Sequence, residues 1–133
     1  MSYHCTIPVR LRHTDAAGVL FFTEQLALAH EAYEAFLDEH QLSVGEQLAA
    51  GTGAPIVSCE AAFMAPVRVG DRLIFAVSAE HIGQTSFTLT YQILREHDQQ
   101  QVGSCRTVHV CVAEQGRKTP LSDAFRTALQ TLV

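Results

Sequence analysis

One helical segment that is apolar almost all round constrains this fold more than any other feature. Residues 23–40 place Leu26, Ala29, Tyr33, Phe36 and Leu37 at helical spacing, and the run LALA widens that apolar stripe. The spacing predicts a helix with Thr23 as its N-cap. Because such a helix must be covered over much of its circumference, we expect it at the centre of the fold and not on its surface.

Strand patterns surround this helix on both sides in the sequence. Residues 3–12 alternate apolar and polar, and four further strand-like segments cover 56–65, 71–82, 85–96 and 102–114. The turns VRVGDR, IGQT and EHDQQQ separate those four segments. Consecutive strands joined by short turns pair antiparallel. We therefore expect an α+β fold in which an antiparallel five-stranded sheet wraps around the central helix.

Two shorter helices complete the expected elements. Ser43 and Glu46 form a capping-box pattern before a helix that would end at Gly51. Thr119 is expected to cap a C-terminal helix with Pro120 at its first position. The chain contains no linker or repeat, so residues 1–133 are expected to form a single domain.

Charge and cysteine usage exclude several classes of function. The net charge of −5 argues against a nucleic-acid partner, and no apolar run reaches membrane-spanning length. With no secretory signal pattern, the expected location is cytoplasmic. The cysteines lack metal-ligand spacing, so no metal site is expected. Cys5, Cys59 and Cys105 lie in apolar or strand-like segments and are expected to be buried, reduced thiols.

The stretch TDAAGVLFF places a carboxylate, Asp15, just before the central helix. Asp15 is open to two interpretations: an ordinary turn residue that binds backbone N–H groups, or a catalytic group. Gly18 favours the second, because glycine lets the chain turn sharply or a ligand approach closely. The free N–H groups of the following helix also suit a developing oxyanion. Together these parts would suffice to hydrolyse an acyl group.

Other polar residues are open to structural and functional interpretations. His30 is expected to be packed or to face a substrate, because no nucleophile with a suitable pattern accompanies it. Ser86, in the segment GQTSF, belongs either to a plain hairpin turn or to a surface for a long polar ligand.

The motif DAAGVLFF matches the form D-x-x-G-[VI]-x-[FY] that leads into the central helix of the hotdog-fold acyl-CoA thioesterases of the 4-hydroxybenzoyl-CoA type. The chain resembles this family through PIVSCEAAFMAPVRVGDRL and GQTSFTLTYQI as well. Within the family, TDAAGV, HEAYEAFL and PIVSCEAAF are most similar to the 1,4-dihydroxy-2-naphthoyl-CoA hydrolases of phylloquinone and menaquinone biosynthesis. Where many members carry Tyr or His, this chain has Phe21 and Phe22.

The resemblance implies a role for each matched residue. Asp15 would be the nucleophile or general base, and the Phe22 backbone N–H would polarise the thioester carbonyl. Gly18 and Val19 would shape the loop against the thioester. The remaining implied substrate-binding residues are His30 and Glu31, on the helix facing the aryl group, and Ser86, near the pantetheine arm.

The resemblance also implies an assembly and a substrate. Family members form dimers or tetramers with sites between subunits, and their substrate carries the CoA, so no separate cofactor is expected. The alternatives are a thioesterase for another aryl or short acyl-CoA or for acyl carrier protein, and a non-catalytic module that binds acyl-CoA.

Overall fold

The computed structural model describes all 133 residues. Its elements follow one another along the chain as β1 (Tyr3–Pro8), α1 (Phe22–Glu39), α2 (Val44–Ala49), β2 (Ile56–Phe63), β3 (Arg72–Ile82), β4 (Ser86–Arg95), β5 (Gln101–Val110) and α3 (Asp123–Gln130), with one-turn 3-10 helices at Leu11–His13 and Glu114–Gly116. None of these helices has the length and apolar character needed to cross a lipid bilayer.

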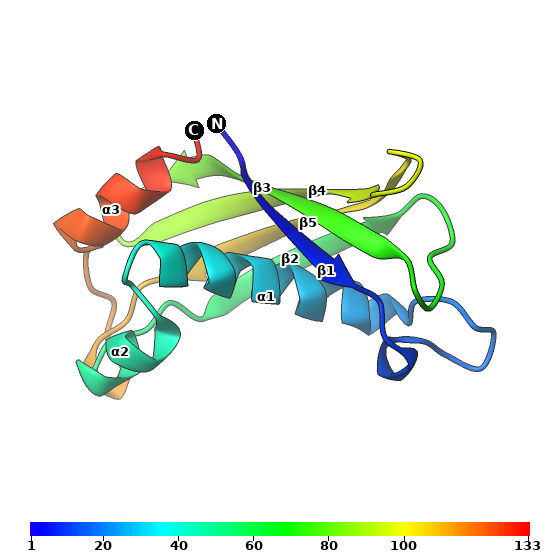
Figure 1. The fold of residues 1–133 in the computed structure, drawn as a ribbon. Helices are drawn as coiled ribbons and strands as arrows, with labels where there is room; N and C mark the ends of the chain where they lie inside the picture. The colour runs from blue at the N-terminus through cyan, green and yellow to red at the C-terminus, as the bar shows by residue number, and fades with distance from the viewer.

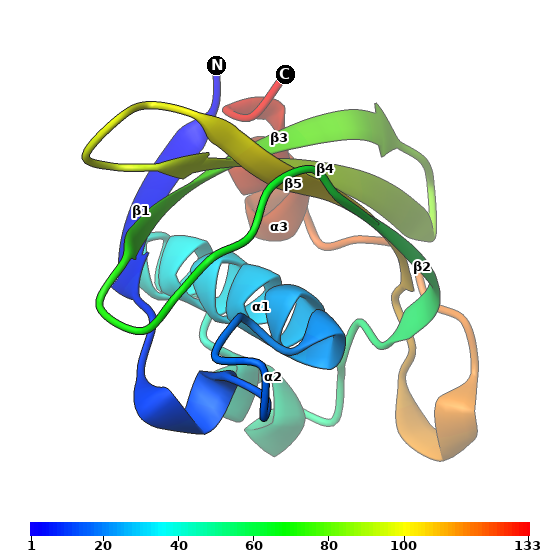
Figure 2. The same cartoon turned by 90° about the vertical axis from the view of Figure 1, so that its right-hand side faces the viewer.

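The five strands form one sheet in the order β1-β3-β4-β5-β2, and every neighbouring pair is antiparallel. Figure 2, which shows α1 obliquely with its N-terminal end toward the viewer, shows the sheet curving over that helix. In Figure 1 the same helix runs beneath the strands from the loop that joins it to β1 to the end that leads into α2. The expected α+β architecture, a five-stranded antiparallel sheet around a central helix, is confirmed.

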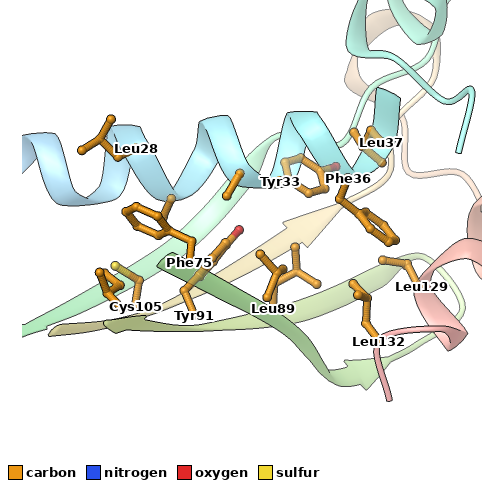
Figure 3. Close-up of a cluster of buried hydrophobic side chains, with 14 of the residues drawn as sticks. Leu28, Tyr33, Phe36, Leu37, Phe75, Leu89, Tyr91, Cys105, Leu129 and Leu132 are labelled. Atoms are coloured by element: carbon orange, nitrogen blue, oxygen red, sulfur yellow. The ribbon is translucent and has the colours of Figure 1, made fainter. Parts of the chain in front are cut away.

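Strand alternation directs a continuous apolar face onto α1. In β4 the residues Phe87, Leu89, Tyr91 and Ile93 are fully buried, whereas Gln92 between them is exposed. The register places Tyr91 between Val77 of β3 and Cys105 of β5, so side chains on adjacent strands pack side by side. Figure 3 shows Leu28, Phe36 and Leu37 of α1 facing this cluster, with Leu129 and Leu132 closing its α3 end.

The predicted helix caps were partly wrong. Ser43 caps α2 as expected, because its hydroxyl accepts the Glu46 N–H at 3.2 Å. Helix α1 begins at Phe22 instead, with Phe21 as an N-cap that makes no side-chain bond, so Thr23 lies inside the first turn. Helix α3 is capped by Ser122, whose hydroxyl accepts the Phe125 N–H at 3.1 Å, and not by Thr119.

The edge strand β2 differs from the other strands in its burial. All of its residues except Ala61 are exposed, and its outer edge has no neighbouring strand. The prediction that Cys59 is buried is therefore wrong, because Cys59 lies on this exposed edge strand. Cys105 is buried as expected, and Cys5 is half-buried.

Candidate active site

A tight loop between β1 and α1 fixes the position of Asp15. The Asp15 N–H donates to the Val19 carbonyl at 2.9 Å, and the Gly18 N–H donates to the Asp15 carbonyl at 3.0 Å. Gly18 adopts a φ of +79°, in the left-handed region that side chains other than glycine's disfavour. Gly18 therefore allows the chain to reverse and to bring Asp15 back toward the start of α1.

The two oxygens of the Asp15 carboxylate have different surroundings. Oδ1 accepts the Ala17 N–H at 2.9 Å and the Val19 N–H at 3.4 Å. Oδ2 makes no hydrogen bond with the protein. The turn interpretation of Asp15 therefore holds for one oxygen. The other oxygen is left available to a ligand, and the catalytic interpretation stays a prediction.

The first turn of α1 supplies free hydrogen-bond donors beside this loop. The Phe21 N–H donates to the His13 carbonyl at 2.9 Å, and the Glu24 N–H donates to the Phe21 carbonyl at 2.9 Å. The N–H groups of Phe22 and Thr23, between them, have no protein acceptor. These donors and the partial positive charge of the helix N-terminus favour an anionic oxygen at this point.

Asp15 and the start of α1 line one cavity of about 470 Å³. Its walls are mostly apolar and comprise Val19, Leu20, Phe21, Phe22, Gln25 and the 63–67 segment that follows β2. Phe22, Phe63 and Met64 are more than half exposed. Exposed apolar groups around a carboxylate indicate a surface that a ligand or partner covers.

Gln25 is a buried polar residue in this cavity that the sequence analysis did not identify. Its side-chain amide donates to the Ala62 carbonyl of β2 at 3.1 Å and to the Ser104 carbonyl of β5 at 3.2 Å. These bonds fasten the first turns of α1 to the sheet. The sequence did contain a signal for this residue. Gln25 lies three positions before Leu28 and four before Ala29, a spacing that places a polar side chain on the buried face of the helix.

The structure places the other predicted site residues away from Asp15. His30 lies at the middle of α1, where its Nδ1 is 3.0 Å from Glu34 Oε2. Ser86 begins β4 opposite Val110, and its carbonyl accepts the Gly83 N–H at 2.7 Å. Glu31 is exposed. The pKa of the Cys5 thiol on β1 is raised mainly by the burial of that thiol and secondly by the negative charge of Glu31. Within one chain, only Asp15, Gly18, Val19 and Phe22 come together.

His30 lines a second cavity of about 540 Å³ at the opposite end of α1, bounded by α2, residues 51–55 and the segment after β5. Buried His109 supports one wall, because its Nδ1–H donates to the Ala54 carbonyl at 3.0 Å. Its Nε2 must then accept from the Thr107 hydroxyl, 2.9 Å away. Burial lowers the pKa of His109 to about 4, so the ring is neutral at pH 7.

The fold and the Asp15 loop agree with a family match that covers most of the chain. The family model described as the thioesterase-like superfamily matches residues 9–129. This chain belongs to the thioesterase-like superfamily. Membership confirms both the hotdog fold and the expected enzyme class, a thioester hydrolase.

Several thioesterase relatives are similar over nearly their whole length. The 1,4-dihydroxy-2-naphthoyl-CoA hydrolase of Synechocystis sp. is 34% identical over 91% of this chain and 89% of its own length. The protein of the same name from Rippkaea orientalis is 35% identical over 90% of this chain and 89% of its own. A solved 1,4-dihydroxy-2-naphthoyl-CoA thioesterase from Synechocystis superposes with a TM-score of 0.93 at 31% identity, covering 99% of this chain and 98% of that one.

Proposed function

We propose that this thioesterase hydrolyses 1,4-dihydroxy-2-naphthoyl-CoA to the free acid and CoA, a step of phylloquinone or menaquinone biosynthesis, in the cytoplasm. The observation that carries the proposal is the free Oδ2 of Asp15 in the same cavity as the open N–H groups of α1. The names of the relatives from Synechocystis sp. and Rippkaea orientalis support the substrate. Residues 1–133 act as one catalytic domain, and CoA enters as part of the substrate, so no resident cofactor takes part.

In the proposed mechanism the thioester carbonyl oxygen accepts the Phe22 N–H. Asp15 Oδ2 either attacks the carbonyl carbon or removes a proton from an attacking water. The carbonyl electrons move onto oxygen, and the N–H stabilises that charge in a site from which apolar walls exclude water. Collapse of this intermediate breaks the carbon–sulfur bond and releases CoA thiolate. If Asp15 is the nucleophile, water then hydrolyses the acyl anhydride. Gly18 and Val19 shape the loop around the thioester.

The test of this proposal is the variant Asp15→Asn. The amide keeps the shape of the side chain but is neither nucleophile nor base, so kcat should fall at least about a hundredfold. Release of CoA thiol from 1,4-dihydroxy-2-naphthoyl-CoA is measured with a disulfide reagent, and circular dichroism checks the fold. Asp38→Asn, an exposed carboxylate late in α1, is the matched control and should keep the wild-type rate.

A panel of thioesters separates this function from its alternatives. The proposed enzyme gives its highest kcat/KM on the dihydroxynaphthoyl ester. A higher value for 4-hydroxybenzoyl-CoA, a short acyl-CoA or an acyl carrier protein would replace the substrate but keep the reaction. Tight binding of these esters without thiol release would show a binding module, and a wild-type rate in Asp15→Asn would remove Asp15 from the mechanism.

Self-association through β2 is part of the same proposal. The strand has an unpaired edge, and it exposes Ile56, Val57 and Phe63. An open apolar edge is a template for pairing with another strand, and symmetric dimers are the commonest assemblies. Two copies related by a two-fold axis would pair β2 antiparallel with β2 and extend each sheet into the other.

Light scattering tests this assembly. We expect the mass of two chains, or of four if dimers pair further, and Val57→Lys should shift the protein toward single chains with loss of activity. In the paired arrangement His30 would face the substrate held by the neighbouring subunit, and this contact is a prediction, as are the substrate contacts of Glu31 and Ser86. A wild-type protein that is monomeric at assay concentration would refute the pairing.

A further inference from the structure

The second cavity, of about 540 Å³, is suited to a compact and mostly apolar group. Small or aliphatic side chains form most of its wall, including Val44, Leu48, Gly53, Ala54 and Val112. The volume lies within the range of about 300–1,000 Å³ that is usual for small-molecule sites. Three of its polar side chains already have protein partners: Gln47 and Thr52 donate to the Leu42 and Gln47 carbonyls, and His30 Nδ1 lies 3.0 Å from Glu34 Oε2. The ring of Tyr33 completes the lining.

The hydroxyl of Tyr33 is an unused polar group on this lining. Tyr33 is 2% exposed, yet its hydroxyl makes no hydrogen bond with the protein, whereas that of the other buried tyrosine, Tyr91, is 3.2 Å from Thr107 Oγ1. The one fully enclosed polar side-chain atom without a partner is His13 Nε2, so the Tyr33 oxygen keeps some accessible surface, and tyrosine hydroxyls in such places usually have a partner. Burial raises the pKa of Tyr33, so the group stays protonated and able to donate. Its partner is therefore to be sought in the cavity.

Neighbouring rings hold Tyr33 in place. Its ring centroid lies 4.8 Å from that of His109 and 5.4 Å from that of His30. His109 is itself fixed by the Ala54 carbonyl and the Thr107 hydroxyl. A hydroxyl fixed in this way discriminates between ligands better than one on a mobile side chain, because no ordering is needed when it forms its bond.

The Tyr33 hydroxyl cannot serve the Asp15 of its own chain. Tyr33 lies eleven residues after Phe22, which along a helix is about 16 Å. Strand β2 connects the two cavities, because Pro55 of the second cavity precedes it and Met64 of the Asp15 cavity follows it. An antiparallel pairing of β2 with its copy exchanges these two ends. The Tyr33 cavity of one subunit then adjoins the Asp15 cavity of the other.

We propose that the Tyr33 hydroxyl is a specificity determinant that binds a ring hydroxyl of an aromatic thioester whose carbonyl is held at Asp15 of the partner subunit. The inference rests on the proposed function, and it identifies the group that recognises the ring hydroxyl of the substrate. The cavity walls accept the aromatic carbons, and Tyr33 offers the hydrogen bond. A ring without the hydroxyl leaves Tyr33 buried and unpaired, and sites of that kind reject the deficient ligand strongly.

The kinetic test compares 1-hydroxy-2-naphthoyl-CoA and 1,4-dihydroxy-2-naphthoyl-CoA with 2-naphthoyl-CoA, which lacks ring hydroxyls. Wild type should prefer at least one hydroxylated ester by about tenfold or more in kcat/KM. Tyr33→Phe should lose that preference by slowing the hydroxylated ester and by relieving, not increasing, the penalty on 2-naphthoyl-CoA. Tyr91→Phe is the matched control, because it removes a buried hydroxyl that already has a protein partner, and it should keep the preference.

A binding measurement separates failure of this inference from failure of the proposed function. Calorimetry with the free acids 1-hydroxy-2-naphthoate, 1,4-dihydroxy-2-naphthoate and 2-naphthoate needs no catalysis, and it is run on wild type and both Phe variants. Tyr33→Phe should selectively weaken binding of the hydroxylated acid. If wild type cleaves no aryl thioester but Tyr33→Phe still selectively weakens binding of the hydroxylated acid, the proposed reaction is refuted and the role of Tyr33 stands. A preference that Tyr33→Phe retains, or equal loss on all ligands, overturns the inference.

Discussion

The buried imidazole of His109 makes the stability of this protein depend on pH in a calculable way. The ring is fully buried, and burial lowers its pKa from 6.5 to about 4, outweighing the opposing effect of the bond to the Ala54 carbonyl. Between these two values the unfolded chain binds a proton that the folded chain does not. Stability is therefore independent of this group above pH 6.5 and falls as the pH is lowered toward 4.

The size of this effect follows from the shift in the pKa of His109. One pKa unit corresponds to about 1.4 kcal/mol, so the whole shift corresponds to about 3 kcal/mol. Between pH 7 and pH 5 the expected loss is about 2 kcal/mol, a large part of the usual stability of a domain. The loss levels off below pH 4, where both states carry the proton.

Urea unfolding at a series of pH values measures this dependence. The chain has no tryptophan, so circular dichroism is the signal. Protein concentration is held constant because the proposed self-association would also stabilise the fold. His109→Gln is the control, since its amide can bond to Ala54 or Thr107 but does not titrate. The variant should be less stable at pH 7 and should show a shallower slope between pH 6.5 and 5. Equal slopes in both proteins would refute the assignment of this effect to His109.

Three further substitutions test packing and capping through the free energy of unfolding. In Gly103→Ala the added Cβ would lie 2.6 Å from Gln25 Oε1 and 2.9 Å from the Ala62 carbonyl, so we expect a loss of about 1–3 kcal/mol. Gln25→Met leaves two strand carbonyls without their donor and should cost about 1–3 kcal/mol. Ser122→Ala should cost about 1 kcal/mol by removing the α3 cap, whereas Thr119→Ala should change little; the reverse order would contradict the capping seen here.

The sheet and the central helix were predictable because each is encoded by a long repeating pattern. Alternation through β4 and helical spacing from Leu26 to Leu37 are averaged over many residues, so a single exception does not hide them. Caps depend on single residues. Thr119 and Ser122 both precede apolar positions, and only the packing of Phe125 and Leu129 determines which of them begins α3.

In the candidate site, residues whose contacts are close in sequence could be predicted, whereas residues whose contacts are distant in sequence could not. The Asp15 turn closes within five residues, so its motif is readable in the sequence. Gln25 acts through Ala62 and Ser104, and the free hydroxyl of Tyr33 is apparent only once α2 and residues 51–55 surround it. The exposure of Cys59 also depends on strand order, because alternation cannot tell an edge strand from a central one.

The Gln25 amide joins the start of α1 to two strands, one of which is the edge strand β2. A displacement of that edge is thereby transmitted to the open amides of the helix. Linkage is reciprocal, so if two copies pair through β2 as proposed and steady that strand, pairing would strengthen acyl binding, and a bound acyl group would strengthen dimerisation by the same factor. Turnover per chain should then decline on dilution even while every chain stays folded.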